Sequence, residues 1–396
     1  MRILVGWDDA SQGETIGLIL NIDDTEAVVA ICPEQLLELA KSDQQWDVIL
    51  LAIGAPDVNN SLELFRQLRK LLPEIPVVGA CDPSDVIRMA RFLTQGMKAY
   101  VLRDSSNDFI FLLHATLSNT VEAVHAERER EIAEKLREEI DSVRKLQESI
   151  IPADVVSPEG YRIVARYEPS QIRVFGGQPV VMAGGDYYEV FRIDDDHTIV
   201  LVGDASGHGM KACMSIMTMH TLISMIRSEG YEDVAGFVAK VNRRLCEQSF
   251  IQNGGGFITV LYGVLNTRTH QFTWTSAGHP IPLLMSRSDG TVTPLGPHEA
   301  GGLPLGLYEE AEYETNVVDL PSESRLLIYT DGVIEAFGDV NGQHAEFGVD
   351  GVMRTLCQHR CANVDASLQA LFDDSQAITN GAGRHDDTSV VLIDRL

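Results

Sequence analysis

The residues of this sequence that are best suited to chemistry are aspartates in glycine-rich turns. Five turn-like segments combine small residues with carboxylates or histidines: Gly184-Gly-Asp-Tyr-Tyr-Glu189, Gly203-Asp-Ala-Ser-Gly-His-Gly209, Ser276-Ala-Gly-His-Pro280, Tyr329-Thr-Asp-Gly332 and His385-Asp-Asp-Thr-Ser389. In three of them an aspartate adjoins the end of a predicted strand. Glycine allows tight turns and a close approach of the backbone. Each aspartate alone would be an ordinary turn or cap residue, so the argument depends on their joint pattern.

Carboxylates that gather from distant segments repel one another unless a cation neutralises them. Mg²⁺ and Mn²⁺ prefer oxygen ligands and keep several waters. Two such ions about 3.5–4 Å apart can clamp a phosphoryl group for in-line attack by water. The sequence shows no convincing signature of a cysteine nucleophile or of a phosphate-binding P-loop. The pattern therefore favours phosphoryl chemistry that depends on metal ions.

The order of the motifs resembles that of a known family. Between residues 152 and 396 the chain carries, in sequence, Gly-Gly-Asp, Asp-x-Ser-Gly-His-Gly, Phe257-Ile-Thr-Val-Leu-Tyr262, Ala-Gly-His-Pro, Gly302-Leu-Pro-Leu-Gly306, Thr-Asp-Gly and Asp-Asp-Thr-Ser. Each motif is weak alone, but the ordered set resembles the PPM, or type 2C, protein serine/threonine phosphatases, in the bacterial branch of SpoIIE and RsbU. The resemblance implies a hydrolase with an αββα sandwich fold of the α+β class.

The same resemblance implies a set of metal ligands. Asp204 would bridge two ions, either Mn²⁺ or Mg²⁺. Asp186 and the backbone carbonyl of Ala205 would complete the protein ligands of one ion. Asp331 and Asp386 would bind the other. All four carboxylates are present, which predicts an active enzyme with these aspartates as its catalytic residues.

Other polar residues in the motifs are predicted to have structural roles. We expect Asp387 to support its loop rather than to bind metal. His208 and His279 are expected to fix their Gly-His turns, with proton donation to the leaving oxygen as the alternative. Ser206 stands where the eukaryotic branch of the family carries a histidine, so the general acid stays unassigned.

An insertion is predicted near the site. Residues 171–183 form a longer stretch than this branch usually has there, and they are predicted to be an inserted hairpin with a turn at Gly176-Gly177.

The cysteines indicate no disulfide framework. Six cysteines are scattered without a CxxC pair, which favours reduced thiols in the cytoplasm. Cys357 and Cys361 have helical i, i+4 spacing and are interpreted as ordinary cysteines on a helix face rather than as a metal site.

The composition excludes several classes of function. The net charge is −27, whereas nucleic-acid and anionic-membrane surfaces need clustered lysine and arginine. No apolar run approaches the roughly 18 residues that span a bilayer. The first residues lack a signal-peptide pattern and are predicted to form a buried strand. The sequence therefore predicts a cytoplasmic protein that binds neither nucleic acid nor membrane.

The elements that must position the aspartates alternate between short strands and a few helices. Met210–Ser228 and Val234–Ser249 are predicted to be the two longer helices of this region. The predicted strands are Phe257–Leu265, Gln271–Ser276, Arg325–Tyr329 and Ser389–Ile393. This mixture favours an α+β sandwich.

Residues 1–118 have a different pattern, in which strands and helices alternate. The predicted strands are Arg2–Val5, Ala27–Ile31, Val48–Ile53, Val77–Ala80 and Ala99–Leu102. Helical stretches between them include Pro33–Lys41, Leu62–Leu72 and Asp85–Gln95. Five βα alternations imply a parallel sheet that is covered on both faces. The order resembles the flavodoxin-like receiver domain of two-component response regulators.

The departures from that receiver family are informative. The phosphate-accepting aspartate, the hydroxyl residue after the fourth strand and the lysine of the fifth strand are replaced by Ala52, Cys81 and Arg103. The acidic pair after the first strand is kept as Asp8 and Asp9. A methyl group cannot form an acyl phosphate, so we predict a pseudo-receiver. Asp57 is the alternative acceptor, but we do not favour it because it lies five residues beyond Ala52, in the predicted loop.

Residues 119–151 are predicted to be a long charged helix that links the two parts. Its apolar residues recur three or four apart, at Ile132, Leu136, Ile140, Val143, Leu146 and Ile150. Such a narrow stripe indicates either a coiled-coil contact within a homodimer or packing on the chain's own domain.

Together these features predict a bacterial signalling phosphatase of three parts, namely a pseudo-receiver over 1–118, a helical linker over 119–151 and a phosphatase domain over 152–396. By the resemblance, its substrate would be an anti-sigma-factor antagonist carrying phosphoserine or phosphothreonine. A partner bound to the pseudo-receiver would activate the enzyme through the linker. The alternative is a pseudophosphatase adaptor that binds a sigma-factor regulator without catalysis.

Overall fold

The computed structural model describes residues 1–22, 24–42, 44–54, 58–103, 108–152, 154–172, 180–181, 184–207, 209–226, 230–248, 256–297, 301–340, 343–380 and 384–396. The chain divides into two compact units, Met1–Leu136 and Arg137–Leu396. Asp57, His208 and the Gly176-Gly177 turn, for which the sequence suggested roles, lie outside the described residues.

The first unit is built on one parallel sheet. Its strands are β1 (Arg2–Gly6), β2 (Glu26–Ala30), β3 (Val48–Ile53), β4 (Val77–Cys81) and β5 (Ala99–Leu102). All neighbours pair in parallel, in the order β2-β1-β3-β4-β5. The five strands predicted from the sequence are therefore confirmed, with ends that differ by at most one residue.

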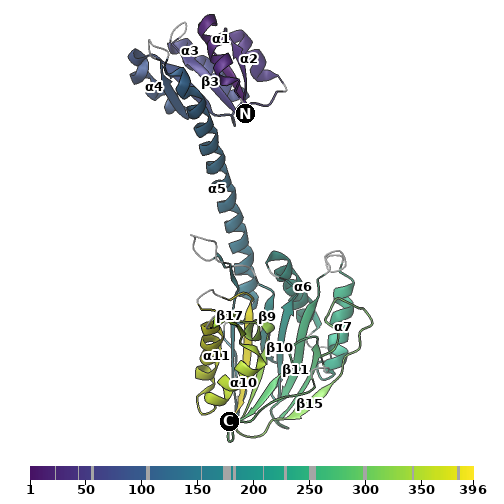
Figure 1. Ribbon diagram of the computed structural model, residues 1–396. Helices are drawn as coiled ribbons and strands as arrows, with labels where there is room; N and C mark the ends of the chain where they lie inside the picture. The colour runs from purple at the N-terminus through teal and green to yellow at the C-terminus, as the bar shows by residue number, and fades with distance from the viewer. Residues whose placement is uncertain are drawn as a thin grey trace. The chain divides into compact units, whose positions relative to one another are not determined.

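Helices cover both faces of this sheet (Figure 1). They are α1 (Ala10–Leu20), α2 (Pro33–Lys41), α3 (Val58–Leu71), the short 3-10 helix η1 (Pro83–Asp85), α4 (Val86–Leu93) and the first part of α5 (Ile110–Ile150). Buried residues of α2, α3 and α4 form the core on one face, while those of α1 and α5 form the core on the other. The sequence prediction of an α/β unit with two covered faces is confirmed.

The residues that the sequence analysis compared with receiver positions have contacts at the carboxyl end of the sheet. Ala52 is buried in β3. The Arg103 guanidinium forms an ion pair with Asp8, with one contact at 2.9 Å, and lies 4.4 Å from the centre of the Trp7 ring. Asp9 instead caps α1 by accepting a hydrogen bond from the amide of Gln12 at 2.7 Å. The two acidic residues therefore have separate structural roles.

Helix α5 is longer than predicted. It begins at Ile110 rather than near residue 119, because no glycine or proline separates the last helix of the first unit from the charged stretch that follows. Leu113 and Leu117 are buried against the sheet, whereas Ile132 and Leu136 are more than half exposed. Within the described part of the chain, no helix is both long enough and apolar enough to cross a membrane.

The second unit is a sandwich of two five-stranded sheets. One sheet has the order β15-β12-β11-β10-β9 and the other β14-β13-β16-β19-β6. The strands of the first are β9 (Asp186–Arg192), β10 (His197–Ala205), β11 (Ile258–Asn266), β12 (Gln271–Ala277) and β15 (Asn316–Asp319). Those of the second are β6 (Tyr161–Glu168), β13 (Leu283–Ser286), β14 (Val292–Pro294), β16 (Ser324–Tyr329) and β19 (Thr388–Arg395). Short pairs join β7 (Gln171–Ile172) to β8 (Val180–Val181) and β17 (Phe337–Val340) to β18 (Gln343–Glu346).

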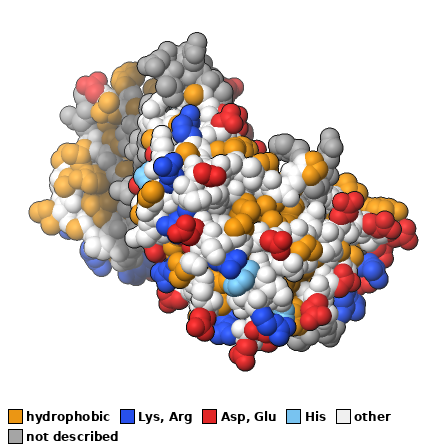
Figure 2. All heavy atoms as spheres, turned by 90° about the horizontal axis from the view of Figure 1, so that it is seen from below, with side chains coloured by type: hydrophobic (Ala, Val, Ile, Leu, Met, Phe, Trp, Pro, Cys, Tyr) orange, Lys and Arg blue, Asp and Glu red, His pale blue; other side chains and the backbone are white. Residues whose placement is uncertain are grey.

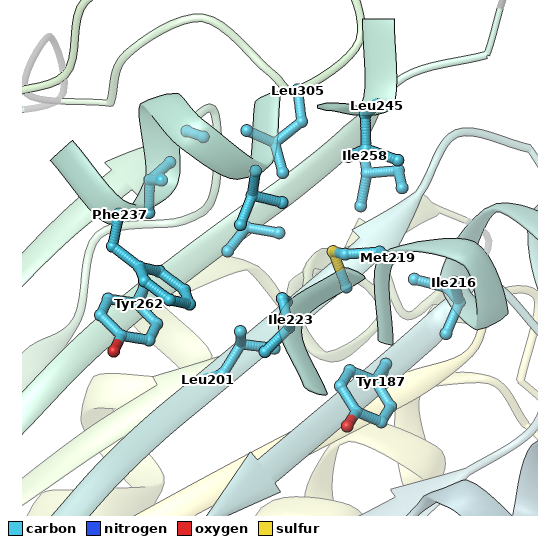
Figure 3. Packing of buried hydrophobic residues seen from close by; sticks show 14 of the residues in the cluster. Tyr187, Leu201, Ile216, Met219, Ile223, Phe237, Leu245, Ile258, Tyr262 and Leu305 are labelled. Carbon is cyan, nitrogen blue, oxygen red and sulfur yellow. The ribbon is translucent and has the colours of Figure 1, made fainter. Parts of the chain in front are cut away.

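Helices form the outer layers of the sandwich. They are α6 (Met210–Ile226), α7 (Val234–Cys246), α9 (Asp331–Ile334), α10 (Gly348–Gln358) and α11 (Val364–Ile378). Buried residues of α6 and α7 pack on one sheet, those of α10 and α11 pack on the other, and a third core lies between the sheets. Figure 3 shows Ile216, Met219 and Ile223 of α6 packed over the strands, beside the stacked rings of Phe237 and Tyr262. The predicted αββα sandwich is confirmed.

Two predictions about helices, made from the sequence, were wrong. The second unit contains α10 and α11 in addition to the two longer helices that were predicted. Two glycines, Gly348 and Gly351, weaken the helical signal of α10, although Asn363 caps α11 as a typical N-cap residue. Since α10 ends at Gln358, Cys361 lies beyond it and does not share a helix face with Cys357.

The surface carries charges of both signs. On the face shown in Figure 2, acidic, basic and apolar side chains are interspersed, and the lysines and arginines form no continuous area there.

The Asp8–Arg103 pair leads to a test of the first unit. Burial raises the pKa of Asp8, but the hydrogen bond and charge of Arg103 outweigh it and lower that pKa overall. A lowered carboxyl pKa contributes stability above the ordinary value, and this contribution is lost as the pH falls through the folded-state value. We expect Asp8→Asn to reduce the free energy of unfolding by about 1–3 kcal/mol near neutral pH, with a difference that shrinks below about pH 4.

Urea unfolding followed by tryptophan fluorescence at several pH values measures this difference. Asp24→Asn, at an exposed aspartate of the same unit, is the matched control. Equal stability of Asp8→Asn and the unmodified chain at neutral pH would contradict the assignment.

Candidate functional site

The first two aspartates lie side by side on neighbouring strands. Asp186 begins β9, Asp204 lies near the end of β10, and the two are direct partners in the antiparallel pairing. Asp186 is buried, with 1% of its surface exposed. A side chain at Gly185 would meet the Ala205 carbonyl oxygen at 2.7 Å and Asp204 Oδ1 at 3.1 Å. Only glycine therefore lets this turn approach the two oxygen donors so closely.

The other two aspartates come from the second sheet. Asp331 follows β16 as the first residue of α9, and Asp386 lies in the loop before β19. Burial raises the pKa of Asp331 to about 6, and the charges of Glu335 and Asp386 add to this effect. The structure thus brings Asp331 and Asp386 within electrostatic reach of each other.

Asp204 lies within electrostatic or hydrogen-bonding reach of each of the other three aspartates. Burial raises the pKa of Asp204 to about 8, with further increases from the charges of Asp331 and Asp386. Burial also raises the pKa of Asp186 well above its usual value, and Asp204 is the largest charge contribution. The first and second sheets therefore contribute two of these aspartates each to one cluster, to which Asp387 adds a further charge.

Hydrogen bonds from Thr330 and Asp387 support the aspartate cluster. The Thr330 hydroxyl donates to Asp186 Oδ2 at 2.6 Å and accepts from the Ser389 amide at 2.8 Å. Asp387 accepts from the amides of Ser170 and Gly185, at 2.8 and 2.6 Å. Asp387 thus supports the loop, as expected, and it fixes the turn that carries Asp186.

The sequence analysis did not identify one residue that supports the turn of Asp186. Gln147, in the last turn of α5, is fully buried. Its Nε2 donates to the carbonyl oxygen of Asp186 at 3.2 Å, and its Oε1 accepts from the amide of Gly184 at 2.7 Å. Both bonds lie within the second unit, so the end of α5 is tied directly to the backbone of the aspartate turn.

Ser206 and His279 have structural contacts. His279 is buried, and its Nδ1 lies 3.0 Å from the Thr259 hydroxyl. Burial lowers the pKa of His279 to about 3, against a smaller opposing contribution from the Tyr329 backbone, so the ring is neutral near pH 7. Ser206 Oγ accepts from the amide of Phe257 at 2.9 Å. These contacts favour the turn-fixing role over proton donation by His279.

The oxygen-rich donor set fits a hard divalent cation. Among the described residues, no three acidic, histidine or cysteine side chains are already arranged around one ion position. A set that includes the Ala205 carbonyl and waters needs fewer side chains for each ion, because Mg²⁺ keeps several waters. Carboxylates that hold protons because they are desolvated and crowd one another would give them up to such a cation.

A comparison with protein families finds one match over the second unit. The model described as "Stage II sporulation protein E (SpoIIE)" matches residues 194–396, just over half of the chain. The match contains three of the four aspartates, Asp204, Asp331 and Asp386.

Individual proteins and structures give weaker likenesses. The chain is 21% identical to the phosphoserine phosphatase RsbU of Bacillus subtilis over 313 residues, which cover 79% of this chain and 87% of RsbU. It is 25% identical to the phosphoserine phosphatase RsbP of the same species over 202 residues, covering 50% and 46% of the two chains. Among solved structures, the SiaA-PP2C domain of Pseudomonas aeruginosa matches with a TM-score of 0.54 and 19% identity, over 67% of this chain and 98% of that domain. The structural likeness supports the fold.

The crowded carboxylates lead to a test by metal addition. An ion that binds only the native state at 100 times its dissociation constant adds about 2.7 kcal/mol of stability. We expect Mn²⁺ to raise the unfolding temperature of the chelator-treated chain, and Asp204→Asn to remove most of that shift. The metal-free variant should also be more stable than the metal-free parent, because one repelling carboxylate is gone.

Thermal unfolding with and without Mn²⁺ measures both effects. Asp195→Asn, at an aspartate whose side chain is fully exposed, is the control and should keep the full shift. A full Mn²⁺ shift in Asp204→Asn would rule out this cluster as the metal site.

Proposed function

Since the chain belongs to the SpoIIE family of protein phosphatases, we propose that it hydrolyses phosphoserine or phosphothreonine on a partner protein, with two Mn²⁺ or Mg²⁺ ions as cofactors. The observation that carries the proposal is the gathering of four aspartates from four separate segments into one cluster, in which Asp186 is buried and the other three are partly buried. Asp204 would bridge the ions, with Asp186 and the Ala205 carbonyl on one side and Asp331 and Asp386 on the other.

Within this proposal each residue has a defined task. Divalent ions held here would supply positive charge that offsets the phosphoryl group and activates water for attack. Thr330 orients Asp186 by hydrogen bonding, and Asp387 holds the Gly184–Asp186 turn in place. No covalent intermediate on the protein is needed.

The substrate is proposed to be a small anti-sigma-factor antagonist domain in the cytoplasm of a bacterium. Two relatives, RsbU and RsbP, are named phosphoserine phosphatases, which supports serine as the phosphorylated residue. The two units of the chain support a signalling enzyme whose catalytic part is controlled by a second part.

Regulation is proposed to pass from a pseudo-receiver over 1–118, through the helical linker 119–151, to the phosphatase domain over 152–396. Ala52 supports control by binding of a partner rather than by phosphorylation, since its methyl group cannot accept phosphate. The exposed apolar residues Ile132, Leu136 and Leu146 support a coiled-coil contact with a second copy of the chain. Gln147 supports transmission, because it ties the helix end to the turn of Asp186.

The competing proposal is a pseudophosphatase adaptor that binds without catalysis. It is supported by Ala52, because this residue gives the chain one site that resembles a phosphate-accepting site but cannot accept phosphate. Retention of all four aspartates favours the enzyme.

Activity gives the first test. We expect the full chain to hydrolyse p-nitrophenyl phosphate and a phosphoserine peptide with Mn²⁺, and to lose activity with a chelator. Asp331→Asn should reduce kcat at least 100-fold, equivalent to about 2.7 kcal/mol or more, because it removes one ligand of the site. Asp350→Asn, at an exposed aspartate of α10, is the control. Absence of any Mn²⁺-dependent turnover, also with an activating partner bound, would favour the adaptor.

Gln147 gives a separate test of the proposed coupling. Gln147→Leu keeps the side-chain size but leaves the Gly184 amide and the Asp186 carbonyl without their partner. A lost hydrogen bond in a buried site costs about 1–3 kcal/mol, so we expect the Mn²⁺ concentration for half-maximal activity to rise by about tenfold or more. Gln358→Leu, the same change at the exposed end of α10, should leave it unchanged. An unaltered Mn²⁺ dependence in Gln147→Leu would show that this contact does not position the site.

A further inference from the structure

A cavity of about 470 Å³ opens beside the aspartate cluster. Asp331 forms part of its wall, together with residues of the Gly278–Pro280 turn, the ends of β13 and β14, and helices α9 and α10. Its volume falls within the range of roughly 300–1,000 Å³ that is typical of ligand pockets. The cavity lies wholly within the second unit.

The lining of the cavity is predominantly apolar. Ile281, Leu283, Ile334, Val349 and Met353 contribute aliphatic side chains, and three prolines add to them. Among the described residues that line it, there is no lysine or arginine. A lining of this chemistry does not suit a nucleotide or a free phosphate, because its described part has no basic side chain to balance their charge.

The cavity also differs from a void in the core. Leu283 is fully buried, but Ile334, Val349 and Met353 are only partly buried, so part of the apolar lining is exposed to solvent. Their apolar atoms would gain from contact with an incoming apolar group.

We propose that this cavity receives an apolar side chain of the phosphorylated substrate, close in sequence to the phosphoserine. The inference rests on the proposed phosphatase function and specifies the class of substrate. A phosphoryl group at the cluster lies against Asp331, which is also a wall of the cavity. An extended peptide advances about 3.3 Å per residue, so a side chain within roughly four positions can reach it.

This arrangement separates two parts of recognition. The aspartate cluster would bind the phosphoryl group in any substrate, while the cavity would select the sequence around it. Full burial of a leucine side chain favours association by roughly tenfold to more than a hundredfold. The preference should therefore be visible in kcat/KM for peptides and absent for p-nitrophenyl phosphate, which has no peptide chain.

The experiment uses the full chain with Mn²⁺ and phosphoserine peptides of one polar background sequence. A single leucine is placed in turn at each of the four positions on either side of the phosphoserine, and each peptide is compared with its asparagine counterpart. We expect at least one leucine position to raise kcat/KM by about tenfold or more. Met353→Trp, which fills the cavity, should remove that preference and leave hydrolysis of p-nitrophenyl phosphate within about twofold of the parent.

Two further variants keep the result interpretable. Met225→Trp makes the same change at an exposed methionine of α6 and should retain the leucine preference. Val349→Phe fills the cavity from another wall and replaces Met353→Trp if that variant does not fold. A parent with no leucine preference, or a preference that survives filling of the cavity, overturns the proposal.

Failure of the proposed function gives a different result. In that case the parent hydrolyses neither the peptides nor p-nitrophenyl phosphate, and fluorescence anisotropy of the labelled leucine and asparagine peptides replaces kinetics. Tighter binding of the leucine peptide, lost on Met353→Trp, would still support the cavity as its binding site. Equal binding of the two peptides would overturn it.

Discussion

The repulsion between four carboxylates in one partly buried cluster is the constraint on which the site depends. Asp186 and Asp204 come from one sheet of the sandwich, and Asp331 and Asp386 flank strands of the other. Burial and mutual charge raise the pKa of Asp204 to about 8 and the pKa of Asp186 well above its usual value, which favours protons on both groups near pH 7 in the absence of metal. The fold tolerates this cost because two packed sheets and their outer helices fix the ends of the strands. A bound cation would relieve this repulsion, so the stability of the second unit would depend on metal binding.

The hydrogen bonds behind the cluster explain how a distant part of the chain could act on it. Thr330 and Asp387 hold the Asp186 turn from the second sheet, whereas Gln147 reaches it from the end of α5. Loss or displacement of the Gln147 contact would move the turn backbone rather than a single side chain. Linkage of this kind requires two states that bind a partner with different affinity, and α5 is the element that joins the two units.

The sequence predicted the parts of the site that depend on local patterns. The four aspartates stand beside glycines in turns, and the strands of the first unit appear as short apolar runs with clear ends. It could not reveal Gln147, because a single glutamine in a charged helix has no signal until the helix end is seen to be buried. The cavity beside Asp331 was equally hidden, since its walls come from segments far apart in the chain. Helix α10 was missed because its glycines obscure an apolar periodicity that is present in Val349, Val352 and Leu356.

The central claim is that metal binding relieves the crowding of these carboxylates, and proton release measures this most directly. Mn²⁺ can be titrated into the chelator-treated chain by calorimetry near pH 7, in buffers that differ in ionisation enthalpy. Because the metal-free pKa of Asp204 is raised to about 8, we predict net release of about one proton or more on binding, falling towards zero well above that pH. Mn²⁺ binding without proton release near pH 7 would contradict the account.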